Sequence, residues 1–437
     1  MKRRHPHQPA SKPSRSALVQ IEKPIYGGAF LARLEGKATF VPLTLPGEQA
    51  RVRIIEDKRS YATAEPEAIL APSPDRIQPR CPHFGSCGGC SYQHTTYETQ
   101  LALKQEILRE TLQRAGVQAP DHIDLLAGEP WGYRNRIRVA FDRAGRVGYR
   151  GRRSHEILPI RECPIAAPLL IQAALQAAEI LRDAKPAFGA TEISLFCDFE
   201  ESALLSSIFV SVPTTRGFNE FAADWKERVP ELVGLECVYQ TLAHEIPKRI
   251  AQWGEESLIY RVAGFDYRVD HGAFFQVNRW LIDGLVQKVV GERRGMLAWD
   301  LFSGVGLFAR QLTNRFKQMI AVESAATATQ ALTRNLDGTT GQSVTADTLS
   351  FLRDSRQAAK PDLIVVDPPR AGLGSDATAA LGEIGADELV YVSCDPSTLA
   401  RDLKAISASG YAIVSVALAD LFPQTFHLET VVTLKKS

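Results

Sequence analysis

The chain has 437 residues and a formal net charge of only +1, with 45% hydrophobic and 23% charged residues. At about 150 residues per domain, this length predicts roughly three domains with enough apolar residues for several cores. There is no run of about 18 apolar residues, and the first twenty residues lack an apolar stretch. We therefore expect neither a membrane span nor a secretory signal, and we predict a cytoplasmic location. The net charge by itself does not suggest a nucleic-acid partner.

Basic residues are nevertheless concentrated in two segments. Residues 1–16 contain lysines and arginines but no acid, and we interpret them as a flexible tail that is either solvated or in contact with phosphate. Eight arginines lie between residues 134 and 153, and the only acids in or near this segment are Asp142 and Glu156. The alternation in RNRIRVAF predicts a strand with arginines on one face, and that face is either solvated or a phosphate-binding surface.

Residues 17–72 predict five short strands separated by turn signals that contain glycine. Five strands in so short a segment predict a small closed barrel of the OB type, a fold that commonly binds oligonucleotides. The run GGAFLARLEGKATFVPLTLPGEQARVRI resembles the TRAM domain, a small barrel appended to RNA-modifying enzymes. We therefore expect the barrel to contact RNA.

The rest of the chain divides into segments with different patterns of apolar residues. After a proline-rich linker and a cysteine cluster, residues 95–117 have the apolar spacing of a helix, and residues 118–265 mix strand and helix patterns. Beyond residue 295, apolar strands alternate with helical stretches, which predicts a doubly wound parallel sheet. The predicted domains are a basic tail 1–16, a TRAM/OB-like barrel 17–72, a central α+β domain 73–94 and 118–265, and a catalytic α/β domain 95–117 and 266–437.

The segment CPHFGSCGGC supplies three of the seven cysteines, Cys81, Cys87 and Cys90. The short spacing lets three thiolates converge, and the glycines let the loop wrap tightly. Cys163, in RECPIAAP, is the best candidate for a fourth ligand, because a proline commonly follows such ligands. Disulfides are disfavoured in a reducing cytoplasm, so we expect a metal site, and the spacing leaves zinc and an iron–sulfur cluster open. We interpret two other cysteines as buried and structural, Cys197 and Cys237.

The sequence LAWDLFSGVGLFAR is typical of a strand-to-helix junction that binds a ligand. Asp300 ends the strand, and Gly304 and Gly306 allow a tight turn with close backbone approach. Ala309 stands where the dinucleotide pattern G-x-G-x-x-G has its last glycine, which disfavours NAD. Glu323 ends the next strand about twenty residues on, where a carboxylate can accept both ribose hydroxyl protons.

Asp347, in TADTLSF, follows the third strand of this sheet. Its carboxylate is placed either to meet an adenine amino group or to cap the following helix. The glycine loop and the two acids on consecutive strands together resemble S-adenosylmethionine-dependent methyltransferases. We therefore predict a Rossmann-like α/β methyltransferase domain with S-adenosylmethionine as its cofactor.

Two motifs indicate which atom receives the methyl group. The motif LIVVDPPRAGLG places Asp367 at the end of the fourth strand, and Arg370 stands where amine methyltransferases often have an aromatic residue. This argues against an exocyclic amine as the acceptor. The motif ELVYVSCDPSTLARDL places Cys394 at a strand end beside a helix N-terminus, which suits a reactive thiolate, although a small buried cysteine is the alternative.

Carbon 5 of uracil is a poor nucleophile, and thiolate addition to carbon 6 makes it reactive. The adduct must then lose the proton on carbon 5, so a base is required. Glu429, in FHLETVVTL, opens the last strand and is the best candidate for this base, although an ordinary strand glutamate is the alternative.

The set GAFFQVN, DLFSGVG, VDPPRAG, YVSCDPSTLARDL and HLETV resembles the RNA uracil-5 methyltransferase family. With the barrel and the cysteine cluster, the resemblance covers nearly the whole chain. It implies methylation of carbon 5 of a specific uridine, with Cys394 as nucleophile and Glu429 as base. It also implies cofactor contacts from Gln276, Phe302, Glu323 and Asp367, and a [4Fe-4S] cluster on Cys81, Cys87, Cys90 and Cys163. The barrel and cluster are similar to the 23S rRNA branch, so 23S rRNA is the expected partner, while the oligomeric state stays open.

Three positions depart from the family pattern. Ser303 replaces a cysteine, Leu307 replaces an asparagine that is frequent in the ribosomal enzymes, and Gln424 replaces a frequent histidine. The alternatives are the same reaction on tRNA, an iron–sulfur redox or radical RNA-modifying enzyme, and an RNA-binding protein without activity. The cysteine spacing is not the C-x₃-C-x₂-C of radical enzymes, and the set of strand-end polar residues disfavours a protein without activity.

Overall fold

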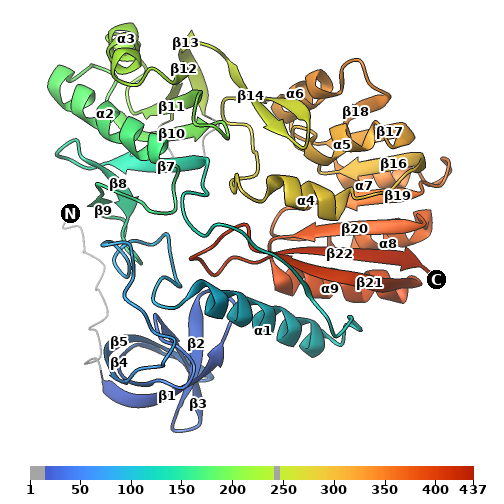
Figure 1. Ribbon diagram of the computed structural model, residues 1–437, viewed down its shortest axis with the longest axis horizontal. Coiled ribbons are helices and arrows are strands. Elements are labelled where there is room, and N and C mark those ends of the chain that lie inside the picture. Colours follow the sequence, from blue (N-terminus) through green and yellow to red (C-terminus); the bar gives the residue numbers. More distant parts are fainter. Residues whose placement is uncertain (1–14, 241–246) are drawn as a thin grey trace, which may run out of the picture.

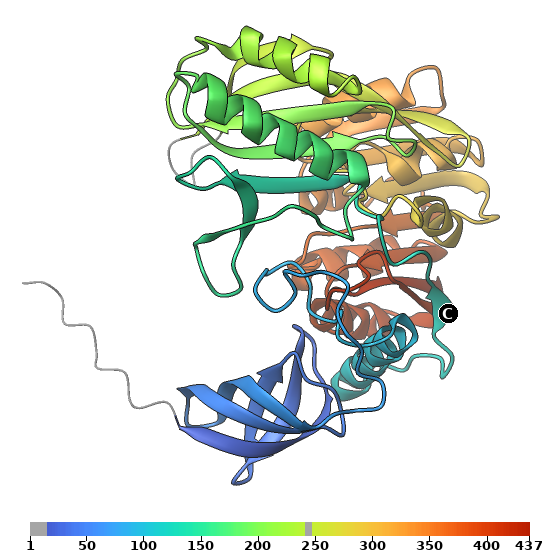
Figure 2. The same cartoon turned by 60° about the vertical axis from the view of Figure 1, so that its left-hand side comes forward.

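The computed structural model describes residues 15–240 and 247–437, which form three folded units (Figure 1). A small barrel (blue) lies at one corner, a central unit (green) above it, and a C-terminal unit (orange and red) beside both. Figure 2 shows the segment between the barrel and the first helix, in pale blue, between the barrel and the central unit. Apart from its last two residues, the predicted tail 1–16 lies outside the described residues. None of the described helices is long and apolar enough to span a membrane.

The first unit is a closed five-stranded barrel, as the strand and turn pattern predicts. Its strands pair in the order β1-β2-β3-β5-β4. Buried Val19 and Ile21 alternate with more exposed neighbours on β1, and buried Ala50 and Val52 do so on β4, which is the period-two pattern of a strand with one buried face. The strands are β1 (Ser16–Pro24), β2 (Ala29–Leu34), β3 (Lys37–Pro42), β4 (Gln49–Asp57) and β5 (Tyr61–Ala71).

Helix α1 (Tyr97–Ala115) matches the helix predicted over residues 95–117 and is shared by two cores. It ends at Gly116, whose φ of 72° lies in the left-handed region that favours glycine. Leu103 packs into the core of the barrel, whereas Leu108 packs into the core of the C-terminal unit. The helix therefore joins the barrel to the C-terminal unit by packing on both.

The central unit is a mixed seven-stranded sheet in the order β13-β12-β11-β10-β7-β8-β9, with two helices packed on it. This architecture agrees with the predicted α+β pattern. The apolar core between helices and sheet includes the fully buried Phe188 and Trp225. The elements are β7 (Arg136–Phe141), β8 (Val147–Arg150), β9 (Ile157–Pro159), α2 (Pro168–Ala184), β10 (Ala190–Cys197), β11 (Leu204–Val210), α3 (Phe218–Arg228), β12 (Leu232–Tyr239) and β13 (Lys248–Gly254).

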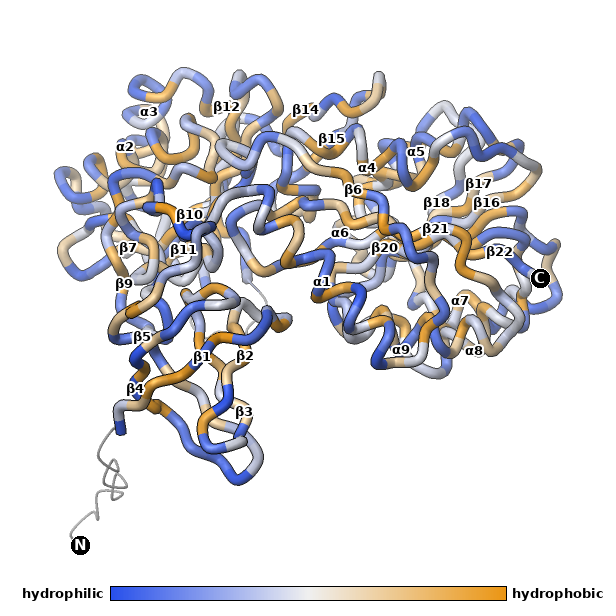
Figure 3. Tube along the Cα trace, turned by 60° about the horizontal axis from the view of Figure 1, so that its bottom comes forward, coloured by the Kyte–Doolittle hydropathy of each residue, from blue (hydrophilic) through white to orange (hydrophobic). Residues whose placement is uncertain are grey.

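The C-terminal unit is an eight-stranded sheet in the order β18-β17-β16-β19-β20-β22-β21-β6, with helices on both faces (Figure 1). Strands β16 to β20 are parallel, and β22 runs antiparallel between β20 and β21. All residues of β19 are buried, as expected for a strand covered on both faces, and the strands of this sheet carry long hydrophobic stretches in Figure 3. The predicted doubly wound sheet is confirmed.

Its elements follow one another as strand and helix along the chain. The order begins with α4 (Ile282–Val289), β16 (Gly295–Leu301), α5 (Leu307–Leu312), β17 (Phe316–Glu323), α6 (Ala326–Leu336), β18 (Gly341–Thr345) and α7 (Thr348–Asp354). It continues with β19 (Leu363–Val366), α8 (Gly374–Ile384), β20 (Glu388–Ser393), α9 (Pro396–Ala408), β21 (Tyr411–Ala419) and β22 (Glu429–Lys436).

Elements from the sequence range predicted as central also pack on the C-terminal unit. Strand β6 (Asp124–Leu126) is the edge strand of this sheet and pairs in parallel with β21. The hairpin of β14 (Ser257–Val262) and β15 (Phe265–Asp270) buries Tyr260 in the core that contains α4 and α5. The structure thus differs from the predicted range 118–265, because these tertiary contacts leave no local sequence pattern.

The arginine-rich segment is not the uniform exposed face that the alternation suggested. Buried Ile137 and Val139 confirm the apolar side of β7. Four arginines, however, pair with carboxylates that lie far away in the sequence: Arg138 and Arg150 with Glu192, and Arg152 and Arg153 with Glu65 of the barrel. Each of these two carboxylates is shared by two arginines, so positive charge remains on this face, and its contact with phosphate stays a prediction.

Candidate active site

The carboxyl ends of the C-terminal strands carry the polar residues that the sequence identified. Leu301 of β16 pairs with Val366 of β19, which pairs with Tyr391 of β20. Strand β22 runs antiparallel to β20 and places Thr430 opposite Ser393. The residues next to these pairs therefore share one edge of the sheet: Asp367, Cys394 and Glu429.

The turn between β16 and α5 is shaped to leave room for a ligand. Asp300 Oδ2 accepts a hydrogen bond from the backbone N–H of Ala309 at 3.0 Å, which ties the strand end to the helix. Gly306 has a φ of 91°, in the left-handed region that favours glycine, and a Cβ there would also come within 2.7 Å of the Leu332 side chain. A Cβ on Gly304 would instead meet open space. The open side of the turn faces the edge where ligands of α/β sheets bind.

Two further acids lie at the ends of the neighbouring strands. Glu323 closes the glycine turn, because its Oε2 accepts from the Gly304 N–H at 3.0 Å and its Oε1 from the Ala325 N–H at 2.8 Å. Asp347 is exposed after β18, and its Oδ1 accepts from the Ser350 N–H at 3.2 Å. Asp347 therefore caps α7, which was one of its two interpretations, and it lies at the same edge of the sheet.

The remaining residues implied to contact the cofactor are Phe302 and Gln276. Phe302 directly follows β16 with a φ of 66° and packs half-buried against the core. Gln276 is 8% exposed, and its backbone carbonyl accepts from the Asn135 side chain at 3.0 Å. The nearby Asn278 donates to the Leu421 carbonyl, after β21, at 3.1 Å. Gln276 therefore lies where the central and C-terminal units meet.

Two buried carboxyl groups at the edge hold their protons more strongly than exposed aspartates do. Asp300 is fully buried, and its Oδ1 has no hydrogen-bond partner among the described residues. Burial, and next the charge of Asp367, raise the pKa of Asp300 to about 8. Burial likewise raises the pKa of Asp367 to about 7. An unpaired buried carboxyl oxygen is costly unless a ligand satisfies it, so this edge suits a ligand with N–H donors and positive charge.

Cys394 and Glu429 lie across from each other where β20 ends and β22 begins. Glu429 is 5% exposed, and burial together with the charge of Asp367 raises its pKa. Burial, and next the charges of Glu429 and Asp367, raise the pKa of the Cys394 thiol to about 11, whereas Arg370 lowers it. The N-terminus of α9 is capped by the Asp395 carboxylate, so the helix end does not offset the effect of burial on the thiol. The thiol must lose its proton as it attacks.

Residues 420–428, here called the connecting segment, lead from β21 to Glu429 and contact α1. Lys104 of α1 donates to Asp420 Oδ1 at 2.5 Å, and both side chains are fully buried. Gln424, which replaces the family's histidine, has a φ of 68° and accepts from the Gln100 side chain at 3.0 Å. Helix α1 therefore helps to position β22, the strand that carries Glu429.

The four cysteines of the predicted metal site line one cavity of about 450 Å³: Cys81, Cys87, Cys90 and Cys163. The same cavity is lined by side chains with a buried nitrogen that has no hydrogen-bond partner among the described residues: His83, Gln93, Arg134 and Arg136. Within residues 15–240 and 247–437, no group of three or more His, Cys, Asp or Glu is arranged to hold a single metal ion. A single ion needs its ligands to meet at one point, whereas these thiols surround a volume.

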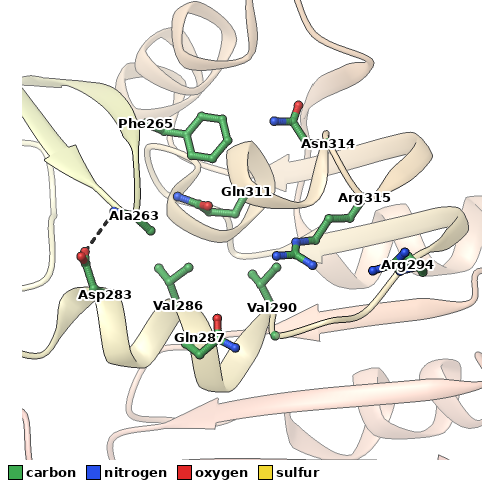
Figure 4. A pocket seen from close by; sticks show the side chains of 11 residues that line it. Ala263, Phe265, Asp283, Val286, Gln287, Val290, Arg294, Gln311, Asn314 and Arg315 are labelled. Carbon is green, nitrogen blue, oxygen red and sulfur yellow. Dashed lines mark hydrogen bonds between the residues drawn. The ribbon is translucent and has the colours of Figure 1, made fainter.

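A second cavity, of about 510 Å³, lies at the amino ends of the strands of the C-terminal sheet (Figure 4). Arg294, which precedes β16, and Arg315, which precedes β17, both line it. Figure 4 also shows Asp283 of α4, which accepts from the Ala263 N–H at 3.0 Å. Ligands of open α/β sheets bind at the carboxyl ends of the strands, so this cavity at the amino ends is not the candidate active site.

The strand order, the glycine turn after β16 and the acids at the next strand ends define an S-adenosylmethionine-dependent methyltransferase. The structure is similar to that of the Pyrococcus abyssi tRNA (uracil-54, C5)-methyltransferase in complex with S-adenosyl-L-homocysteine. The TM-score is 0.77 over 96% of this chain and 100% of that chain, with 23% sequence identity. Residues 251–437 match the family model of tRNA (Uracil-5-)-methyltransferase, and residues 15–66 match the TRAM domain.

Relatives with similar sequences extend over almost the whole chain. An uncharacterized RNA methyltransferase of Streptomyces avermitilis is 32% identical, covering 95% of this chain and 97% of the relative. The 23S rRNA (uracil(1939)-C(5))-methyltransferase RlmD of Pectobacterium carotovorum is 32% identical, covering 96% of this chain and 93% of the relative. The chain therefore belongs to the RNA uracil-5 methyltransferase family, as its motifs predict, and it carries a TRAM domain.

Proposed function

We propose that this methyltransferase transfers a methyl group from S-adenosylmethionine to carbon 5 of one uridine in 23S rRNA, through a covalent bond between Cys394 Sγ and carbon 6. The observation that supports this proposal is the register of β20 and β22, in which Ser393 lies opposite Thr430, so that the next residue on each strand is Cys394 and Glu429. Methylation of a pyrimidine carbon requires a nucleophile at carbon 6 and a base for the carbon 5 proton. The site offers both groups side by side.

The chemistry follows from these side chains. The uridine must leave its stack, because carbon 5 has to reach both the thiol and the methyl donor. As Sγ of Cys394 bonds to carbon 6, the thiol proton passes to the Asp367 carboxylate, which leaves Glu429 free to act as the later base, and the ring becomes an enolate. Arg370, whose charge already favours the thiolate of Cys394, is suited to stabilise that negative charge. Carbon 5 of the enolate then takes the methyl group from the sulfonium, leaving S-adenosylhomocysteine.

The second half of the reaction requires the base. Glu429 takes the proton from carbon 5, the electron pair forms the bond between carbons 5 and 6, and the bond from sulfur to carbon 6 breaks. Burial raises the pKa of Glu429, which makes its carboxylate a stronger base than an exposed glutamate. The products are the methylated uridine and a thiolate on Cys394, which regains a proton.

We assign the cofactor to the same edge of the sheet, where it supplies one electrophilic methyl group. The residues assigned to it are Gln276, Phe302, Glu323, Asp347 and Asp367. The open space at Gly304 and the unpaired Oδ1 of Asp300 fit a ligand that carries positive charge and N–H donors. The helix cap formed by Asp347 uses only Oδ1, so Oδ2 can accept from an adenine amino group.

We further infer that the cysteine cavity holds a [4Fe-4S] cluster on Cys81, Cys87, Cys90 and Cys163. Four thiols around one volume support this assignment, as do the unpaired nitrogens of Arg134 and Arg136, which suit a group of net negative charge. The proposed reaction moves no electrons, so the cluster's contribution is to crosslink the cysteine loop to the central sheet.

Iron and sulfide analysis of protein purified without oxygen tests the cluster. We expect about four iron and four sulfide ions per chain. Cys163→Ser should lower both, whereas Cys197→Ser, at a buried cysteine that does not line the cavity, is the matched control and should not. Zinc without sulfide would overturn the assignment.

The choice of 23S rRNA rests on the Pectobacterium carotovorum relative, which resembles this chain over nearly its whole length. The Pyrococcus abyssi enzyme, named for tRNA, is less similar in sequence. Mapping 5-methyluridine in rRNA and tRNA from cells with and without this protein tests the choice. Loss at one uridine of 23S rRNA supports it, loss only in tRNA transfers the proposal to tRNA, and loss in neither overturns it. We also propose a cytoplasmic location, where these RNAs are found.

A further inference from the structure

We propose that Tyr26, in the TRAM barrel, is a positioning residue for the nucleophile, and that the barrel therefore completes the active site as well as contacting RNA. The inference rests on the proposed function. It states that the Tyr26 hydroxyl holds the peptide group of Cys394 in the orientation that presents Sγ to the uridine.

The contact that supports this role joins residues 368 positions apart in the chain. Tyr26 lies in the turn between β1 and β2, and its hydroxyl donates to the backbone carbonyl of Cys394 at 3.2 Å. Burial, and next the charges of Asp395 and Cys394, raise the pKa of Tyr26. The phenol therefore stays protonated and remains a donor at every pH at which the enzyme would work.

Reciprocal packing keeps this turn in place. Tyr26 packs against the core of the C-terminal unit, while Phe426 of the connecting segment packs against the core of the barrel. Their rings meet edge to face with centroids 5.8 Å apart. A Cβ on Gly28 would lie 3.1 Å from both Phe426 and Ser91, so this turn fits closely between the connecting segment and the cysteine loop. In Figure 2 the upper tip of the blue barrel points toward the red part of the C-terminal unit.

The nucleophile lies in a short turn that the protein holds from both ends. On the helix side, the Asp395 carboxylate accepts from the N–H groups of Ser397 at 2.9 Å and Thr398 at 3.0 Å. On the other side, the carbonyl of Cys394 accepts from Tyr26. Loss of the hydroxyl would free that peptide group to rotate, and the rate of attack falls steeply when reacting atoms are misplaced by about 1 Å. A barrel residue that only binds phosphate would instead change RNA affinity.

The experiment compares three barrel variants on an RNA fragment with 5-fluorouridine at the target position. Fluorine cannot leave carbon 5 as a proton does, so the covalent adduct accumulates and its rate of formation can be measured. Tyr26→Phe keeps the ring and removes the hydroxyl, and should slow adduct formation about tenfold. On the same RNA with ordinary uridine, its kcat should fall about tenfold, with KM for RNA changed less than about twofold. Tyr61→Phe, which removes a phenol elsewhere on the barrel, should change neither. Arg51→Ala, at an exposed arginine of β4, should raise KM and leave kcat unchanged.

Each outcome distinguishes the inference from the proposed function. Adduct formation by Tyr26→Phe at the wild-type rate would overturn the inference and leave the proposed function intact. An increase in KM alone, as expected for Arg51→Ala, would also overturn it, because Tyr26 would then act on RNA binding. Absence of any adduct with the wild-type enzyme would reject the proposed function itself. Thermal unfolding at the wild-type temperature confirms that Tyr26→Phe is folded.

Discussion

The buried ion pair between Lys104 and Asp420 allows a quantitative test of how α1 holds the connecting segment. Both side chains are 0% exposed, and Nζ lies 2.5 Å from Oδ1 and 3.0 Å from the Phe422 carbonyl oxygen. Lys104→Met has similar length but no charge, so it leaves a buried carboxylate without its partner. Removing one member of such a pair costs about 3–5 kcal/mol. We expect the free energy of unfolding to fall by that amount.

Urea unfolding followed by tryptophan fluorescence measures the difference. Adding Asp420→Asn to Lys104→Met removes the unpaired charge and should recover most of the loss. The matched control is Lys23→Met, because Lys23 forms a pair of the same length with Glu110 that is 31% and 26% exposed, and its loss should cost less than about 1 kcal/mol. A Lys104→Met variant within about 1 kcal/mol of the wild type, or a double variant no better than the single one, would refute this account.

Three further predictions concern the carboxyl groups of the active site. Glu429→Gln should let the adduct accumulate and slow release of methylated RNA by about 10²–10⁴-fold in single-turnover assays, and rapid release would exclude Glu429 as the base. Asp367 and Asp300 ionise near pH 7 and 8, so the site gains negative charge as the pH rises through this range. The affinity for S-adenosylmethionine, measured by calorimetry, should therefore rise more steeply with pH than the affinity for S-adenosylhomocysteine, which lacks the sulfonium charge. Parallel curves for the two ligands would contradict this. A carboxyl group whose pKa is raised on folding stabilises the protein at low pH, and this stabilisation is lost as the pH rises toward the raised pKa. Asn cannot ionise, so the melting temperature of Asp300→Asn should increase relative to that of the wild type between about pH 4 and 8. A constant difference between the two melting temperatures would contradict this.

Local pattern was enough to predict the barrel and the parallel sheet. Barrel strands such as β1 and β4 alternate buried residues with more exposed ones, so the buried face of each strand can be predicted from its own residues. Strands such as β19 are apolar throughout, which indicates a sheet covered on both faces. The rule that parallel strands end at one edge then brings Asp367 and Cys394 together without any knowledge of tertiary contacts.

Contacts between units could not be predicted in this way. Tyr26 contacts Cys394, and Glu65 pairs with Arg152, only because the barrel packs beside the other units. The periodicity of apolar residues in the sequence does not predict that packing. The raised pKa of the Cys394 thiol could not be predicted either, since burial and neighbouring carboxyl groups are tertiary properties. Lys104 did leave a signal, because a lysine on the apolar face of a predicted helix needs a buried partner.

The covalent bond between protein and RNA is the central claim, and mass spectrometry measures it most directly. After incubation with S-adenosylmethionine and 5-fluorouridine RNA, followed by nuclease and protease digestion, the account predicts a methylated fluorouridine nucleotide attached to the peptide that contains Cys394. Cys394→Ala should bind the RNA and show no such product. Attachment at another residue, or full methylation of ordinary RNA by Cys394→Ala, would contradict the account.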